Sequence, residues 1–470
     1  MSREGKFAKN TVILALGTFF PKLAIFITLP ILTACLTKEE YGTYDLMVTM
    51  VSLILPAATL QIQSAAFRFL IDVREDEKEK ENIITNIYIF VIATSTIALF
   101  VMYFVLTKYT WSTRLIICLY FLFDIISNTN KQIVRGLSDN KSYAVGCCIG
   151  GLSQILFVLF LVYALRKGLI GGILGLCAAE LLCSSYLFVH AKLYKYIRRR
   201  AVSTKQINSM LAYSWPMVPN GLSQWVMHVS DRLVITFFMG PSSNAVYAVA
   251  YKIPSILAFA QVTFNMAWQE NASIVLNDDD AAQYYSTMFM RLFKTVTGCM
   301  AGLIGISPLL FRIFIRGDYT EAYNQIPILY MGILFYCLSA FWGGIYVAFK
   351  KTKAVGITTI AAAASNLIID IVTIRWIGLY AASLSTLISY IALCVFRMVG
   401  VQKIIKLTYD FKQIILILII MIGQCVLSFM QNTVCNVINF VIGIIVCIYL
   451  NKELLGVLVK RIKKHIGGKT

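Results

Sequence analysis

Long apolar segments alternate along the chain with short polar connections. A helix of about 20 apolar residues crosses the hydrocarbon core of a bilayer, and segments of this kind recur from one end of the sequence to the other. The pattern predicts fourteen transmembrane helices, at residues 11–36, 42–69, 83–107, 112–134, 143–165, 169–191, 209–239, 244–272, 284–315, 324–349, 354–376, 379–399, 412–430 and 434–451. No long soluble segment interrupts them, so we expect an all-α polytopic membrane protein.

Two adjacent segments, 209–239 and 244–272, are unusual because prolines, amides and charges interrupt their apolar sequence. In the first, polar residues at steps of four and three share one helical face: Asn220, Gln224, His228 and Asp231. A similar face of the second carries Tyr247, Tyr251, Pro254, Ala258, Gln261, Asn265 and Trp268. Because such faces are too polar for lipid, they predict a shared water-filled cavity. The alternative is that the prolines kink packed helices and the amides bond across helix pairs.

The predicted span 42–69 also carries a polar stripe, which consists of Asp45, Thr49, Ser52, Pro56, Thr59 and Gln63. Two halves of the chain would therefore each direct a polar stripe inward. The residues that we name as candidates for lining the cavity or for coupling transport to an ion are Asp45, Asn220, Gln224, Asp231, Gln261, Asn265 and Glu270.

Five basic residues remain when those at the connections and span ends are set aside, and we place them within the membrane: Lys22, Arg232, Lys252, Arg291 and Lys294. A charge at the centre of a span costs about 2.5 kcal/mol or more, so we expect these cations to face the cavity. The alternative for Arg291 and Lys294 is that they extend to the membrane surface from a helix end. A cationic cavity is suited to an anion, and phosphate or diphosphate is the common biological choice.

The composition fits this interpretation. The chain of 470 residues is 59% hydrophobic and 14% charged, which leaves too little polar sequence to cover a water-soluble core. Its net charge of +19 would suggest nucleic acid in a soluble protein, but the basic residues lie between the apolar segments, so we expect no nucleic-acid partner. The basic tail from Lys460 to His465 is suited to anionic membrane lipid.

The distribution of basic residues predicts the orientation. We count 29 Lys and Arg in connections on the side of the N-terminus and 8 on the other side. The positive-inside rule therefore places both termini in the cytoplasm.

An internal repeat has a period of 203 residues, because residues 36–44 align with residues 239–247 by hydropathy and turn placement. Six spans separate the copies, so the two halves insert with the same orientation and are related by an axis along the membrane normal. We therefore expect two parallel-repeat six-helix bundles, at 1–203 and 204–408, around a central cationic cavity. Two additional helices and the basic tail follow at 409–470.

The sequence carries no motif for catalysis, a metal or a cofactor. It lacks the G-x-x-x-x-G-K-[ST] loop that binds nucleotide phosphates, and its three histidines, at 190, 228 and 465, are scattered. The twelve cysteines lie mostly in apolar segments without C-x-x-C pairing, which is typical of reduced packing residues. We expect a protein that is not an enzyme and that has no cofactor.

Several features in a fixed order carry a resemblance to a known family: Pro21 and Lys22 in the first span, the turn at 36–44, Arg135-Gly136, Ser230-Asp231-Arg232, the segment 247–254 and the basic cluster from Lys350 to Lys353. Along essentially its whole length the chain resembles the bacterial polysaccharide or O-antigen flippases. Their superfamily, the multidrug, oligosaccharidyl-lipid and polysaccharide exporters, also contains drug extruders and lipid II flippases.

The resemblance implies a flippase of the bacterial cytoplasmic (inner) membrane. Its substrate would be an oligosaccharide repeat unit on undecaprenyl diphosphate, moved by alternating access to the outer leaflet for O-antigen or capsule synthesis. A coupling ion, H⁺ or Na⁺, would set the direction, and a polysaccharide polymerase and glycosyltransferases would be functional partners.

Two alternatives share the fold. A cation-coupled multidrug extruder would need a cavity dominated by carboxylates and aromatic rings, and Lys22, Arg232 and Lys252 argue against it. A lipid II flippase would share both the cationic cavity and the two additional helices, so the sequence separates it only weakly.

Overall fold

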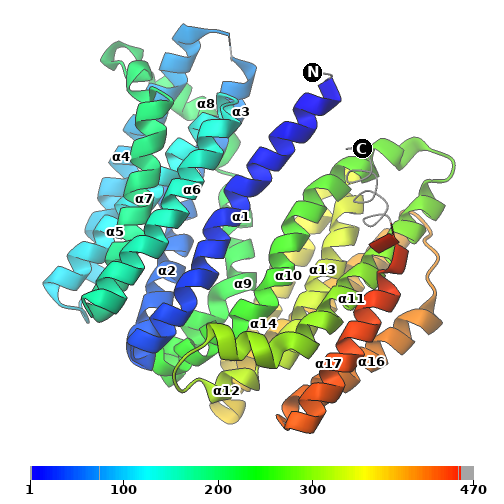
Figure 1. Cartoon of the computed structure of the whole chain (residues 1–470). Helices are drawn as coiled ribbons and strands as arrows, with labels where there is room; N and C mark the ends of the chain where they lie inside the picture. Colours follow the sequence, from blue (N-terminus) through cyan, green and yellow to red (C-terminus); the bar gives the residue numbers. More distant parts are fainter. Residues whose placement is uncertain (1–2, 74, 454, 457–470) are drawn as a thin grey trace, which may run out of the picture. The chain divides into compact units, whose positions relative to one another are not determined.

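The computed structural model describes residues 3–73, 75–453 and 455–456, and it describes side chains from residue 17 onward except at a few helical positions. The described residues are helical and contain no strand (Figure 1). Contacts divide the chain into two compact units. Unit 1 is Met1–Thr236 with Gly240–Ala245, and unit 2 is Phe237–Met239 with Val246–Thr470.

The α-helices of the first half are α1 (Arg3–Cys35), α2 (Lys38–Ala58), α3 (Ile62–Asp72), α4 (Glu77–Val105), α5 (Trp111–Gly136), α6 (Asn140–Val158), α7 (Gly168–His190), α8 (Thr204–Ser214) and α9 (Met217–Met239). The π-helical turn η1 (Leu159–Ala164) extends α6, and two short 3₁₀ turns, η2 (Leu193–Tyr196) and η3 (Arg199–Ala201), precede α8.

The α-helices of the second half are α10 (Pro241–Ile274), α11 (Ala281–Phe314), α12 (Thr320–Tyr323), α13 (Ile326–Ala348), α14 (Thr352–Ile377), α15 (Tyr380–Gln402), α16 (Phe411–Phe429) and α17 (Thr433–Leu450). The 3₁₀ turn η4 (Val275–Asn277) follows α10. Each of the fourteen predicted segments overlaps one of these helices or a helix pair.

Within the described residues, eleven helices are long and apolar enough to cross a membrane, or twelve if the bent pair α2 and α3 forms one span. That set does not include α9 and α10, the two helices with polar faces. The all-helical membrane fold is thus confirmed, and the count of fourteen spans stays a prediction.

Two predicted spans are broken in the structure. The segment 42–69 bends by 57° between α2 and α3, because Leu60 and Gln61 adopt left-handed backbone conformations just after Pro56. The segment 209–239 divides into α8 and α9 at Pro216. Proline lacks the amide hydrogen that a continuous helix needs, which accounts for the break at Pro216, whereas Pro56 lies inside α2 and the first break follows it at the left-handed residues.

In unit 1, α7 packs against both α5 and α6, and α1 packs along α6 (Figure 1). Polar side chains bridge α4, α5 and α7. The Tyr88 hydroxyl donates to Asn130, whose amide nitrogen donates in turn to the Ser184 hydroxyl at 2.9 Å. Hydrogen bonds of this kind fix helix neighbours where the surroundings are apolar.

The helix starts agree with the internal repeat. α2 begins at Lys38 and α10 at Pro241, 203 residues later. The two turns are also in contact, since the Asn244 side chain donates to the Gly42 carbonyl at 2.9 Å. A Cβ atom at Gly42 would lie only 1.7 Å from the Pro241 carbonyl oxygen, so this approach requires glycine.

The compact units divide the chain near residues 236–246, and therefore place α8 and α9 in unit 1. The repeat instead assigns these helices to the second half. The packing explains the difference, because α8 lies against α3 and α4 and α9 bonds to α2, as described below. The division into bundles at 1–203 and 204–408 stays a prediction.

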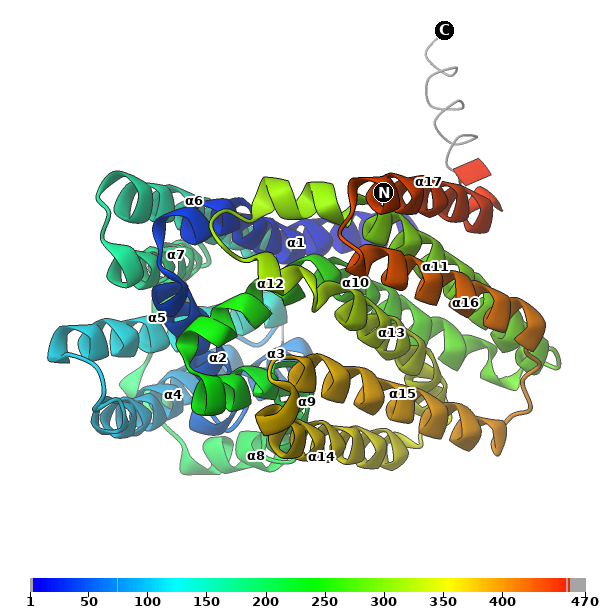
Figure 2. The ribbon, with the colours of Figure 1, turned by 90° about the horizontal axis from the view of Figure 1, so that it is seen from below.

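In unit 2, α13 and α14 pack on α15, and the two C-terminal helices α16 and α17 lie side by side (Figures 1 and 2). α17 also approaches α11 closely, since a Cβ atom at Gly443 would lie 2.6 Å from the Ala301 carbonyl oxygen. Large apolar side chains on α16 and α17, such as Ile419 and Ile445, are exposed. These two helices have the apolar exterior that lipid requires.

Candidate functional site

The polar stripe predicted on α2 faces α9 within unit 1. The Arg232 Nη1 atom of α9 lies 3.1 Å from Asp45 Oδ2 and donates to the Thr49 hydroxyl at 3.1 Å. One turn along, the Trp225 indole nitrogen donates to the Ser52 hydroxyl at 2.9 Å. Asp45, Thr49 and Ser52 recur at steps of four and three, so one face of α2 serves all these contacts.

The ion pair is deeply buried. The side chains of Arg232 and Asp45 are 11% and 5% exposed. In low-dielectric surroundings each charge depends on its partner, because removing one leaves the other uncompensated. Asp45 therefore compensates the charge of Arg232. The sequence alone did not show that these two residues form a pair.

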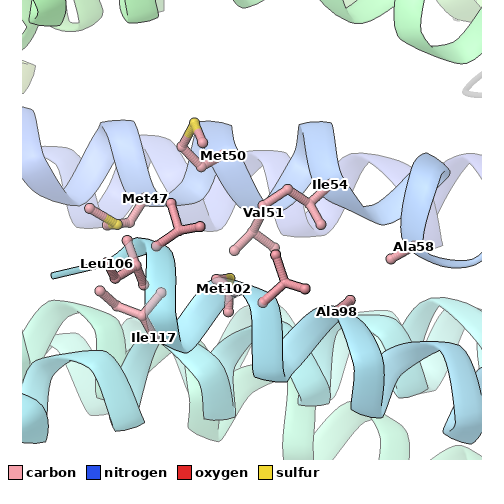
Figure 3. A pocket seen from close by; sticks show the side chains of 11 residues that line it. Met47, Met50, Val51, Ile54, Ala58, Ala98, Met102, Leu106 and Ile117 are labelled. Carbon is pink, nitrogen blue, oxygen red and sulfur yellow. The ribbon is translucent and has the colours of Figure 1, made fainter.

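The opposite side of α2 is apolar. Met47, Val51 and Ile54 line a groove of about 270 Å³ whose other wall comes from α4 and α5, with Met102 and Ile117 among its residues (Figure 3). α2 thus has a polar face, which contacts α9, and an apolar face, which contacts α4.

The structure places the other predicted cations at different degrees of exposure. Lys22 on α1 and Lys252 on α10 are partly exposed, as is Lys294 on α11, and Arg291 on α11 is exposed. Lys22 and Arg232 belong to unit 1, whereas the other three belong to unit 2. Arg232 and Asp45 are the pair of predicted site residues that the described contacts bring together.

The remaining predicted polar residues differ in how deeply they are buried. Asp231 is buried, Asn265 is partly buried, and Glu270 is exposed near the end of α10. The side chains of Asn220 and Gln224, and that of His228, lie outside the described residues.

The stripe on α10 makes contacts with α13. The buried Gln261 amide donates to the Cys337 carbonyl at 3.2 Å, and the Trp268 indole nitrogen donates to the Phe341 carbonyl at 2.8 Å. The Trp268 and Phe341 rings stack with centroids 4.3 Å apart. Gln261 and Trp268 thus join α10 to α13, and the water-filled face stays a prediction.

Arg397 is not among the cations named from the sequence, yet the structure buries it in α15, where it is 6% exposed. Its guanidinium donates to the hydroxyls of Thr358 and Thr359 and to the Ser339 carbonyl. Among the described residues no carboxylate lies within ion-pair distance of it. The signal for this site was its position inside the predicted span 379–399.

Asp370 of α14 is fully buried, and it lies near a second polar cluster of unit 2 along the same helix. One helical turn earlier, the Asn366 side chain donates to the hydroxyls of Ser385 and Thr386 on α15, each at 3.3 Å.

Within the part of the chain that the structure describes, no group of three or more His, Cys, Asp or Glu side chains could hold a metal ion.

Membrane-length helices with buried charges and polar stripes define a multi-pass membrane protein. A family model described as "Polysaccharide biosynthesis protein" matches residues 7–269. The chain belongs to this family. No curated protein matches the sequence.

Solved structures with a similar fold are transporters and flippases. "Lipid II flippase MurJ, inward closed conformation" has a TM-score of 0.69 and 16% identity, and the match covers 95% of this chain and 100% of that one. An inward-facing multidrug resistance MATE family transporter of the MOP superfamily has a TM-score of 0.69 and 14% identity, covering 83% and 98%. A MOP superfamily transporter from Pyrococcus furiosus has a TM-score of 0.60 and 13% identity, covering 84% and 95%.

Proposed function

We propose that this protein is a flippase that moves undecaprenyl-diphosphate-linked oligosaccharide repeat units from the cytoplasmic to the outer leaflet of the bacterial inner membrane, by alternating access. The observation that carries the proposal is the family match over residues 7–269, because that family acts in polysaccharide biosynthesis. The fold shared with a lipid II flippase supports it, since the substrate named there is also a lipid-linked saccharide.

The cations provide the chemistry for the diphosphate. Arg291 and Lys294 lie one turn apart on α11 and are accessible to different degrees, so both can contact one anionic group. Arg232 has a different role, because Asp45 already compensates its charge. A diphosphate that reaches Arg232 must replace Asp45 as the counter-charge, and Arg232 would then make charge-assisted hydrogen bonds to phosphate oxygens.

A multidrug extruder is the second candidate, because several of the matched structures are MATE transporters. Organic cations bind to aromatic rings and carboxylates. Three of the five candidate cations, Lys22, Lys252 and Lys294, are partly exposed and a fourth, Arg291, is exposed, so their charge opposes binding of a cationic drug. The anionic lipid is therefore the better match.

Leaflet exchange of a fluorescent lipid-linked oligosaccharide tests the proposal. In proteoliposomes, a membrane-impermeant quencher reports the fraction of probe in the outer leaflet. We expect protein-dependent exchange, a large loss in Arg291→Ala, and no loss in Arg312→Ala, which removes an exposed arginine near the other end of the same helix. Equal loss in both variants, or exchange without protein, would contradict a specific role of Arg291 in binding the diphosphate.

A further inference from the structure

A cluster of three charged residues in unit 1 has no part in the function proposed so far. Asp124 and Lys131 lie seven residues apart on one face of α5, and Glu180 lies in the middle of the neighbouring helix α7 (Figure 1). Asn128 and Ser127 occupy the same face of α5 between them. The cluster thus lies inside two membrane-length helices that pack against each other.

The two carboxylates have different partners. The Lys131 Nζ atom lies 2.9 Å from Glu180 Oε2, so Glu180 has a full counter-charge. Asp124 Oδ1 accepts a hydrogen bond of 2.9 Å from the neutral Asn128 amide. Among the described residues, no Lys or Arg side chain forms an ion pair with Asp124.

The charges do not balance. One ammonium faces two carboxylates, and the other titratable side chains around them are thiols and phenols, which are neutral at ordinary pH. These are Tyr120 on α5, Cys177 and Cys183 on α7, Cys147 on α6 and Tyr44 on α2. A net negative charge inside a span is costly, and binding of one cation would remove it.

A third polar group points to the same ligand. Ser127 is completely buried and lies one turn from both Asp124 and Lys131; its hydroxyl lies beside the Cys183 thiol of α7 and makes no hydrogen bond of ordinary length to another described residue. Such an oxygen can accept a hydrogen bond from a carboxyl group that becomes protonated beside it. Lys131 and Glu180 are 20% and 24% exposed and Asp124 is partly exposed, so the cluster reaches the surface of the unit.

We infer that Asp124 binds and releases one proton in each transport cycle, while Lys131 and Glu180 stay charged. A metal ion fits less well, because the Lys131 ammonium already occupies the position next to Glu180 and would repel it. This inference rests on the transport function proposed above and assigns the coupling ion, H⁺, to a residue of unit 1.

Infrared difference spectroscopy tests the proton site without any substrate. The purified protein in lipid nanodiscs is compared at low and high pH for the carbonyl stretch of a protonated carboxyl group. We expect a band that titrates in the wild type, is lost in Asp124→Asn and persists in Asp72→Asn, which alters an exposed carboxylate on α3. A full band in Asp124→Asn would overturn the inference.

A transport assay then tests the coupling. Under an imposed pH gradient, the wild type should accumulate lipid-linked oligosaccharide in one leaflet, whereas Asp124→Asn should exchange it without accumulation. Asp124→Glu keeps a titrating carboxyl group and should regain accumulation. This recovery would show that the loss of accumulation in Asp124→Asn is not caused by misfolding. Accumulation driven by Na⁺ alone, or accumulation in Asp124→Asn equal to the wild type, would overturn the inference. A titrating Asp124 band with no lipid movement in any variant would instead refute the proposed function.

Discussion

The Arg232 guanidinium of α9 lies 3.1 Å from the Asp45 carboxylate of α2, although 187 residues separate them in the sequence. The pair joins two helices that both carry polar stripes, and it buries a cation together with its counter-charge. The charge of Arg232 is therefore compensated before any substrate arrives. A substrate anion would have to alter an existing ion pair rather than enter an empty cationic site.

We expect Asp45→Asn to lower the free energy of unfolding by about 3–5 kcal/mol, because it removes the carboxylate that compensates a buried arginine. The double variant Asp45→Asn with Arg232→Gln should regain part of this loss. Thermal unfolding in detergent, followed as the Tm, measures both effects.

The exposed pair Arg68 and Asp72 is the control for this prediction. Their side chains are 49% and 60% exposed, and surface pairs contribute about 0–1 kcal/mol. Asp72→Asn should therefore leave the Tm nearly unchanged. A Tm of Asp45→Asn equal to that of the wild type would show that the buried pair does not stabilise the fold.

Gly42→Ala should destabilise unit 1 strongly. The added methyl group would meet the Pro241 carbonyl oxygen at 1.7 Å, and relief of such a clash requires a backbone shift, which costs about 1–3 kcal/mol or more. Gly356→Ala is the matched variant, because nothing lies within 4 Å of its Cβ position. Limited proteolysis or Tm should separate the two, and an equal response would argue against the close turn contact.

Arg397→Met should retain the fold. A methionine removes a buried charge that has no carboxylate partner among the described residues, and such replacements are often neutral or stabilising. The hydroxyls of Thr358 and Thr359 keep hydrogen bonds to carbonyls of their own helix. If the Tm holds while lipid exchange falls, Arg397 acts in transport. A large drop in Tm would instead mean that its three hydrogen bonds stabilise unit 2.

Gln261→Leu distinguishes packing from cavity lining on α10. Because Gln261 donates to the Cys337 carbonyl between two helices of unit 2, its loss should cost only about 0.6 kcal/mol and leave lipid exchange intact. A normal Tm combined with lost exchange would favour a cavity role for this residue. The Tm and the lipid exchange of Gln261→Leu are compared with those of Asn265→Leu, which alters a residue one turn further along the same helix.

The sequence predicted the helices well because long apolar segments separated by short polar connections favour membrane-length helices. All fourteen predicted segments overlap helices, and the 203-residue repeat recurs in the starts of α2 and α10. The breaks after Pro56 and at Pro216 were less predictable, because proline within a span can either kink or end the helix.

The pairing of the polar stripes could not be predicted from periodicity. Steps of four and three show which residues share a face, but not what that face contacts. The stripe of Asp45 and Thr49 meets Arg232, and that of Gln261 meets α13. The triad of Asp124, Lys131 and Glu180 shows the same limit, because its members fall within the predicted spans 112–134 and 169–191 and nothing in the sequence makes them neighbours.

Transport of the two rival substrates in one preparation tests the central claim most directly. Proteoliposomes are loaded with fluorescent undecaprenyl-diphosphate-linked oligosaccharide, and a parallel set is given a fluorescent organic cation under the same gradients. We predict protein-dependent exchange of the lipid-linked oligosaccharide, loss of it in Arg232→Ala, and no uptake of the cation. Gradient-driven uptake of the cation without lipid exchange would contradict the flippase and identify a drug extruder of the same fold.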